Sequence, residues 1–360
     1  MNILLCLSHS IEEYDQLKLL HGLGYTVASI GGYIDPAHPH TPMRPALPEI
    51  PMVQSIKDAV DSLGTMDNLG AAQARLPDAV LEWADVIIYH HYLERLYGQW
   101  DRIADWKRGD SNRRVIWRSV GQSVEYNERQ AQPFRAQGLE RIAYSPKERN
   151  IPGYSGDDAL IRFYKDPADW YGWTGEDAVI GNITQDMPGR GEYCGLPFWL
   201  AATAGLPAKP AGPGSERLPG GIGALDYDEM RAYLRRCRAY LYTGTQPASY
   251  TLGLIEAMMT GVPVVSIGPE HMRIFPYGPE LFEGHEIATY VASDPDAAGR
   301  LLRYSYLDRP EDRLRDISEE TRQRALDLFG IDTIRKQWRD YLGSPARFEF
   351  SFARASDTAA

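Results

Sequence analysis

Short apolar runs alternate with longer amphipathic stretches in the first half of the chain. The runs occur at Met1–Leu7, Gly24–Ile30, Ala84–Tyr89, Val115–Trp117 and Ile142–Tyr144. Residues 11–23, between the first two runs, instead place apolar side chains at helical spacing. Because short apolar runs separated by helical stretches are typical of βαβ units, this pattern predicts a doubly wound parallel sheet with helices on its faces.

The second half of the chain starts the same alternation again. Residues 177–183, 240–242, 262–267 and 287–292 are predicted strands, and residues 226–236, 294–304, 318–329 and 331–342 are predicted helices. Asp226 and Glu229 have the spacing of a capping box at the start of one of these helices. We interpret the turn-rich stretch from 150 to 173 as the connection between two α/β domains, since 360 residues exceed the size at which a single core stops growing.

The stretch from Tyr240 to Pro269 carries the clearest functional pattern. It reads as a buried strand, a loop of small residues, a helix with apolar residues at helical spacing, and a second buried strand. Parallel strands need a crossover, and open sheets bind ligands beyond the carboxyl ends of their strands. The loop from 243 to 251 is therefore predicted to face a ligand crevice, with Glu256 one turn into the helix.

The same stretch resembles the donor-site signature of retaining glycosyltransferases of the GT-B fold, family 4, which reads roughly E-x-F-G-L-x-x-x-E-A-M-x-x-G-x-P-V-V. Aligned on Glu256, the chain matches this signature at Tyr250, Leu252, Glu256, Ala257, Met258, Gly261, Pro263, Val264 and Val265. The chain departs from it at Ala248, where the family has the first glutamate, and at Thr251, where the family has the first glycine. Because the missing carboxylate usually contacts the transferred sugar, the resemblance leaves the sugar open.

The resemblance implies an α/β protein of the GT-B type, in which two doubly wound Rossmann-like domains face a central crevice. Residues 1–165 would form the acceptor-binding domain and residues 166–330 the domain that binds the nucleotide sugar. Residues 331–343 would form a helix that crosses back to the first domain, and residues 344–360 a tail. The implied enzyme is a hexosyl or pentosyl transferase that moves a sugar from a nucleotide-sugar donor to an acceptor hydroxyl with retention.

The resemblance also implies a donor site. Glu256 would grip the ribose hydroxyls of the nucleotide, and the remaining donor-binding residues would be Ser249, Tyr250, Thr251, Leu252 and Asn182. Gly181–Gly191 looks like the family's G-R-x…K-G loop, with Asn182 in place of the arginine and Arg190 in place of the lysine. Arg190 would act on the leaving diphosphate, because a fixed cation and helix N-terminal amides stabilise developing negative charge. A solvated loop position is the alternative for Arg190.

The first half is expected to hold the acceptor side of the crevice. Ala84–Tyr92 looks like the family's D-V-I-x-x-H step, which gives His90 a catalytic role there, with a structural role at the strand end as the alternative. Residues just past predicted strands should meet at one edge of the sheet, which makes the candidate acceptor-binding residues His9, Gly32, Tyr33, His91 and Gln122. The Pro- and His-rich stretch from 33 to 51 is either a functional loop or a disordered surface excursion.

Composition narrows the class of protein. Hydrophobic residues make up 43% of the chain and charged residues 24%, as in globular proteins. The three cysteines, Cys6, Cys194 and Cys237, lack metal-ligand or disulfide spacing, which favours a cytoplasmic setting. No stretch approaches the roughly eighteen apolar residues of a membrane span. We expect no metal and no cofactor beyond the co-substrate, a nucleotide sugar linked to UDP or GDP.

The sequence does not decide whether the acceptor is a carbohydrate, another small molecule or DNA. The formal net charge of -11 disfavours a polyanionic partner. Residues 102–149, however, hold eleven Lys and Arg against six Asp and Glu, and Trp106 and Trp117 are candidates for stacking on an extruded base. A virus-type DNA glycosyltransferase acting on hydroxylated bases is therefore one alternative, beside a nucleotide-sugar epimerase and a non-catalytic nucleotide-sugar sensor.

Overall fold

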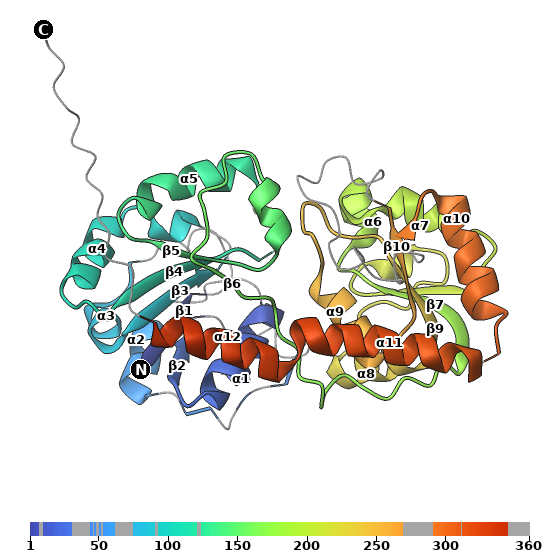
Figure 1. Cartoon of the computed structure of the whole chain (residues 1–360), viewed down its shortest axis with the longest axis horizontal. Helices are drawn as coiled ribbons and strands as arrows, with labels where there is room; N and C mark the ends of the chain where they lie inside the picture. Colours follow the sequence, from blue (N-terminus) through green and yellow to red (C-terminus); the bar gives the residue numbers. More distant parts are fainter. Residues whose placement is uncertain are drawn as a thin grey trace, which may run out of the picture.

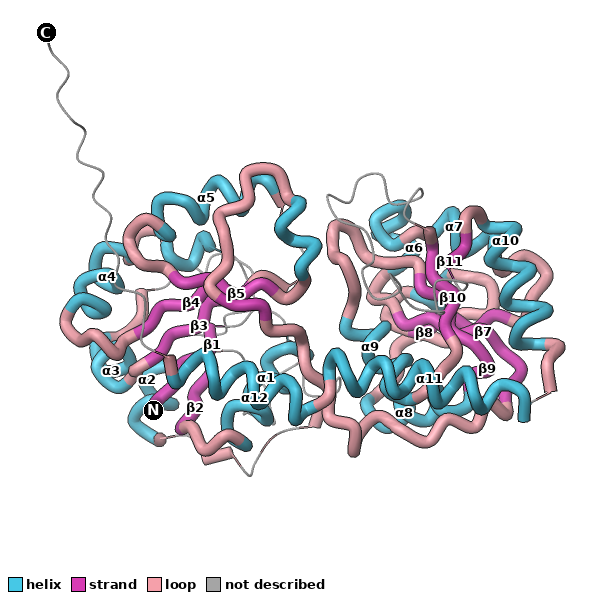
Figure 2. Tube along the Cα trace, viewed as in Figure 1, coloured by secondary structure: helices cyan, strands magenta, loops and turns pink. Residues whose placement is uncertain are grey.

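The computed structural model describes residues 1–6, 10–30, 44–45, 47, 50–51, 53–61, 75–90, 93–120, 124–268, 291–310 and 312–344. Two parallel sheets lie in two lobes side by side (Figure 1). The first half of the chain builds one sheet and the second half builds the other, and helices surround both (Figure 2). This arrangement is the α/β architecture that the alternating pattern predicts.

The first sheet has six parallel strands in the order β2-β1-β3-β4-β5-β6. These strands are β1 (Asn2–Cys6), β2 (Thr26–Ser29), β3 (Val86–His90), β4 (Arg114–Arg118), β5 (Glu140–Ala143) and β6 (Ala159–Leu160). The helices of this lobe are α1 (Ser10–Gly22), α2 (Gln54–Asp61), α3 (Asp78–Trp83), α4 (Trp100–Arg108) and α5 (Glu125–Arg135). The stretch from 150 to 173 is more than the predicted connection, because β6 within it pairs with β5 at the sheet edge.

The second sheet has five parallel strands in the order β11-β10-β9-β7-β8. These strands are β7 (Asp177–Ile183), β8 (Ala208–Ala211), β9 (Cys237–Tyr242), β10 (Val264–Ile267) and β11 (Val291–Ala292). The helices of this lobe are α6 (Met187–Arg190), α7 (Leu196–Ala202), α8 (Tyr227–Arg236), α9 (Leu252–Thr260), α10 (Pro295–Arg300) and α11 (Asp312–Phe329), and α12 (Ile331–Gly343) follows them in the chain. The predicted capping box is present at α8, where Asp226 and Glu229 bond each other's backbone amides. Among the described residues, no helix is both long enough and apolar enough to cross a membrane.

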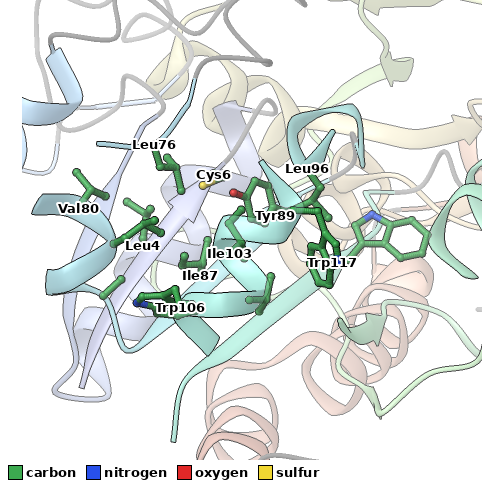
Figure 3. Close-up of a cluster of buried hydrophobic side chains, with 14 of the residues drawn as sticks. Leu4, Cys6, Leu76, Val80, Ile87, Tyr89, Leu96, Ile103, Trp106 and Trp117 are labelled. Atoms are coloured by element: carbon green, nitrogen blue, oxygen red, sulfur yellow. The ribbon is translucent and has the colours of Figure 1, made fainter. Parts of the chain in front are cut away.

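Side chains of the first sheet alternate between two buried clusters, because successive residues of a strand face opposite sides of the sheet. Leu4 and Ile87 lie in the cluster that α3 and α4 cover (Figure 3). Their chain neighbours Ile3 and Val86 lie in the cluster on the opposite face. Burial on both faces explains why these strands read as continuous apolar runs.

The last helix returns to the first lobe. Helix α11 packs on α9 of the second lobe, and α12 continues the chain under the first sheet (Figure 1). Ile334 and Trp338 of α12 are fully buried in the cluster that contains Ile3 and Leu5. The first lobe is therefore completed by residues from the C-terminal part of the chain. The domain boundary near residue 165 stays a prediction.

Candidate functional site

A cavity of about 210 Å³ lies between the two lobes. One wall comes from the residues that follow β7, β8 and β9, and the other includes Ile11, Arg44, Val120 and Phe163. Ligands of open α/β sheets bind beyond the carboxyl ends of the strands. The cavity is therefore the place where the topology of the second sheet favours a ligand.

The start of α9 faces this cavity. Tyr250, Thr251, Leu252 and Glu256 all line it. Thr251 is the N-cap of α9, and its side-chain oxygen accepts a hydrogen bond from Leu254 N at 3.3 Å. The remaining amides of a first helical turn have no partner within the helix and carry partial positive charge, so this end of α9 suits an anion.

Glu256 lies one turn into α9 and is only 2% exposed. Its Oε1 accepts hydrogen bonds from Arg44 Nη2 and from Lys165 Nζ, each at 2.5 Å. Lys165 also donates to Asp15 Oδ2 at 2.7 Å. We call Asp15, Lys165, Glu256 and Arg44 the Glu256 network. Carboxylates and cations alternate in it, so that each buried charge has an opposite neighbour.

The Glu256 network connects the two lobes. Asp15 belongs to α1 of the first lobe, whereas Glu256 belongs to α9 of the second. The Arg44 guanidinium faces the rings of Trp170 and Tyr227, with 5.6 and 5.2 Å to their centroids. Burial raises the pKa of the Asp15 carboxyl, and the nearby Lys165 and Arg44 oppose that change. Each of the four buried charges thus has at least one partner of opposite sign in the network.

Arg190 lines the cavity from the last position of α6. Its Nη1 donates to Gln185 O at 3.4 Å, and both Gln185 and Thr184, which precedes it, also line the cavity. Gly212 follows β8 with a φ of 110°, and a Cβ there would lie 2.4 Å from Thr184 O. Only glycine permits this close approach of the two strand ends. The site thus combines one carboxylate, the two arginines Arg44 and Arg190, and a helix N-terminus.

Ser249 and Tyr250 hold the loop before α9 against the first lobe. Ser249 N donates to Tyr144 Oη at 3.0 Å, and Tyr250 Oη donates to Tyr144 O at 2.6 Å. The two tyrosine rings meet edge to face, with centroids 5.0 Å apart. Tyr250 lines the cavity, whereas Ser249 is buried behind it.

Asn182 and His90 lie inside their sheets. Asn182 Nδ2 donates to Leu241 O at 2.8 Å, and Asn182 Oδ1 accepts from Thr184 Oγ1 at 2.7 Å. His90 is fully buried at the end of β3, beside Arg118 of β4. Neither Asn182 nor His90 is among the residues that line the cavity in the described part of the chain. Their roles in donor binding and catalysis stay predictions.

The candidate acceptor-binding residues His9, Gly32, Tyr33, His91 and Gln122 lie outside the described residues. Ile11 and Val120, each two residues from one of these positions, line the cavity from the first lobe. Several further lining residues carry no assignment from the sequence, namely Arg44, Phe163, Thr184, Gln185, Leu225 and Met230. Thr184 and Gln185 follow β7 directly, so the strand-end rule could have included them. Arg44 lies in the Pro- and His-rich stretch from 33 to 51, and the composition of that stretch is the only feature of the sequence that could have pointed to it.

Several of the basic residues between 102 and 149 are paired inside the first lobe. Arg114 of β4 bonds Glu140 of β5 at 2.5 Å, and both side chains are buried. Arg141 is fully buried and pairs with Glu128 and Glu148. Trp106 and Trp117 are buried in the apolar cluster of the same lobe. Arg114 and Arg141 are therefore not available to phosphates, whereas Arg108, Arg129 and Arg149 are exposed and pair with nearby carboxylates.

No protein-family model matches the sequence, and no curated protein matches it in sequence. The crystal structure of HepE from Anabaena in complex with UDP-glucose is similar, with a TM-score of 0.66 and 16% identity, over 95% of this chain and 99% of that chain. The structure of HepE in complex with UDP and glucose is similar with a TM-score of 0.63 and 14% identity, over 95% of this chain and 99% of that chain. The structure of a glycosyltransferase from Rickettsia africae ESF-5 is similar with a TM-score of 0.59 and 12% identity, over 95% of this chain and 98% of that chain. The chain therefore adopts the GT-B fold, the architecture of the glycosyltransferases to which its structure is similar.

Proposed function

We propose that the protein is a retaining glycosyltransferase, which takes a nucleotide sugar in its second lobe and transfers the sugar to a hydroxyl presented by the first. The observation that carries this proposal is that Glu256, Arg190 and the N-terminus of α9 line one cavity. A carboxylate accepts hydrogen bonds from ribose hydroxyls, and a cation with helix amides suits a diphosphate. The similarity to HepE, which was crystallised with UDP-glucose, supports a nucleotide-sugar donor and makes UDP the first nucleotide to test.

The same groups account for the chemistry of transfer. Negative charge develops on the diphosphate as the bond to the sugar breaks, and Arg190 and the first amides of α9 would stabilise it. In front-face substitution the leaving phosphate takes the proton of the acceptor hydroxyl, so retention requires no pair of carboxylates of the glycosidase type. Ala248 lines the cavity where the family has a glutamate, so the sugar must be recognised by other groups.

The cysteine spacing supports a cytoplasmic setting.

A thermal-shift panel of nucleotides and nucleotide sugars tests the donor class, because a ligand that binds only the folded state raises its melting temperature. UDP, GDP, their glucose conjugates, CDP and ADP would be compared on the full chain. The nucleotide sugar that binds would then be incubated with a panel of carbohydrate and small-molecule acceptors, and NMR would give the anomeric configuration of the product. Retained configuration supports the proposal, and inversion contradicts it. Donor binding without turnover favours a sensor, and an altered sugar nucleotide without acceptor favours an epimerase.

Burial of Arg114 and Arg141 in ion pairs weakens the support for the DNA alternative, because these two arginines cannot reach phosphates. We expect no binding to duplex DNA with hydroxymethylated bases even at low salt. Fluorescence anisotropy at two salt concentrations measures this directly, since phosphate contacts make affinity fall steeply with salt. Salt-dependent binding together with sugar transfer to the duplex would establish DNA as the acceptor instead.

A further inference from the structure

We propose that Lys165 and Arg44 are positioning residues of the donor site, which hold the Glu256 carboxylate so that its second oxygen receives the ribose hydroxyls. This inference rests on the proposed role of Glu256 in nucleotide binding. Its basis is geometric, because both cations bond the same oxygen, Oε1, at 2.5 Å each. Glu256 and Arg44 both line the cavity, so the bonded carboxylate lies where a ligand enters.

The bonding pattern orients the carboxylate. An ionised carboxylate has about four acceptor positions on two oxygens, and here the two cations occupy Oε1. Oε2 is then the oxygen that serves a ligand. A carboxylate with free rotation would offer either oxygen in many directions, whereas one held at Oε1 presents Oε2 in one direction. Fixed geometry of this kind lowers the entropic cost of binding.

Both cations are themselves fixed. The Lys165 side chain is fully buried, and its backbone N donates to Phe329 O at the end of α11 at 3.2 Å. The Arg44 guanidinium is held against the aromatic faces of Trp170 and Tyr227. Neither cation can follow Glu256 through a range of positions. The position of the carboxylate is therefore set by groups from the first lobe and from the connection between the lobes.

The two cations also balance the buried carboxylates of the network. A buried charge is costly unless it is paired with an opposite charge. Lys165 faces two carboxylates, Asp15 and Glu256, and Arg44 faces Glu256. Without Lys165, two buried acids would share Arg44 alone. Loss of Lys165 would therefore remove one of the two groups that hold Glu256 Oε1 and would leave the buried network with an excess negative charge.

A purely structural role for the Glu256 network would produce a different result. If Lys165 and Arg44 only tie the lobes together, their loss weakens the binding of every nucleotide by a similar factor. If they position Glu256, their loss removes the preference for ribose hydroxyls and leaves the affinity for a nucleotide without these hydroxyls unchanged. The ratio of the affinities for the nucleotides with and without ribose hydroxyls thus distinguishes a positioning role of Lys165 and Arg44 from a purely structural role.

The experiment compares UDP with 2′,3′-dideoxy-UDP, and GDP with its dideoxy form, by calorimetry on the full chain. We expect the wild-type protein to prefer the ribose form by about 10- to 100-fold. Lys165→Met should reduce this preference to less than about threefold while the dideoxy affinity stays within about threefold of wild type. Lys18→Met is the matched control, because Lys18 pairs with Asp166 and Asp169 next to Lys165 but bonds neither Glu256 nor Asp15 in the described structure. It should keep the full preference.

The outcomes separate the two proposals. If the wild-type protein binds neither nucleotide, or binds both forms equally, the proposed role of Glu256 fails and the inference fails with it. If the wild type prefers ribose and folded Lys165→Met keeps that preference, the positioning role is refuted while the role of Glu256 stands. If Lys165→Met does not fold, Arg44→Met tests the same inference, because it removes the other cation that bonds Glu256 Oε1. The same loss of preference for the ribose form is then expected. Equal losses for both nucleotide forms would identify a purely structural network.

Discussion

Replacing Glu256 with glutamine should lower both the stability of the protein and its affinity for a nucleoside diphosphate. Asp15 and Glu256 are negative, and Lys165 and Arg44 are positive, so the Glu256 network is neutral as a whole. Glutamine removes one negative charge and leaves an uncompensated positive charge in a buried place. The amide oxygen can still accept a hydrogen bond, but without charge assistance.

The magnitude follows from burial and geometry. Removal of one partner from a buried ion pair costs about 3–5 kcal/mol, and the exposed fractions of 0–2% for Lys165, Arg44 and Glu256 leave little screening by water. Because the amide retains part of the bonding, we expect about 3 kcal/mol, which corresponds to a fall in melting temperature of about 4 °C for a chain of 360 residues. The loss of a charge-assisted bond to the ribose should weaken nucleotide binding by about 1.5–3 kcal/mol, or about 10- to 150-fold.

Two measurements on the same preparation test this prediction. Differential scanning calorimetry gives the melting temperature, and titration calorimetry, at a temperature where the variant is folded, gives the dissociation constant for UDP or GDP. Glu216→Gln is the control, because Glu216 is an exposed carboxylate of the same lobe. A melting temperature within about 2 °C of wild type would refute the buried network. Unchanged nucleotide affinity would refute the placement of Glu256 in the donor site.

Three further predictions concern single residues. Arg190→Ala should weaken binding of the nucleoside diphosphate about tenfold and leave binding of the nucleoside unchanged, because the proposed partner is the diphosphate; equal losses in titration calorimetry would contradict this. Burial raises the pKa of Glu12 from 4.5 to about 7 against the attraction of Arg118, so the stability linked to its proton is complete below about pH 4.5 and is lost as the pH rises through about 7. Glu12→Gln should therefore flatten the fall of melting temperature between about pH 4.5 and pH 7, and an unchanged slope would argue against it. His90→Ala should lower sugar transfer while donor affinity stays intact if His90 serves the acceptor side; reduced donor affinity with normal transfer by the bound donor would identify a structural histidine.

Elements with strong local patterns could be predicted from the sequence. The strand Asp177–Ile183 has the predicted bounds, and α8 begins at the predicted capping box. Strand β9, helix α9 and strand β10 follow one another as the stretch around Glu256 predicts. These features depend on side-chain periodicity and on hydrogen bonds between residues close in sequence, and both can be seen in a single chain. The predicted connection from 150 to 173 was incomplete, because the pairing of β6 depends on the edge of a sheet formed elsewhere.

The partners of a charged side chain were decided by the tertiary structure alone. Arg44 is 212 positions from Glu256 and Lys165 is 91 positions from it, so no local pattern connects them. In the same way, the run of basic residues from 102 to 149 indicates charge, but pairing across neighbouring strands decides that Arg114 bonds Glu140 inside the lobe. The sequence by itself determined the strands and helices that have strong local patterns, and that Glu256 follows a strand-end loop. Only the tertiary packing, within each lobe and between the two, decided which charges meet, because the energy of a buried charge depends on its neighbours in space.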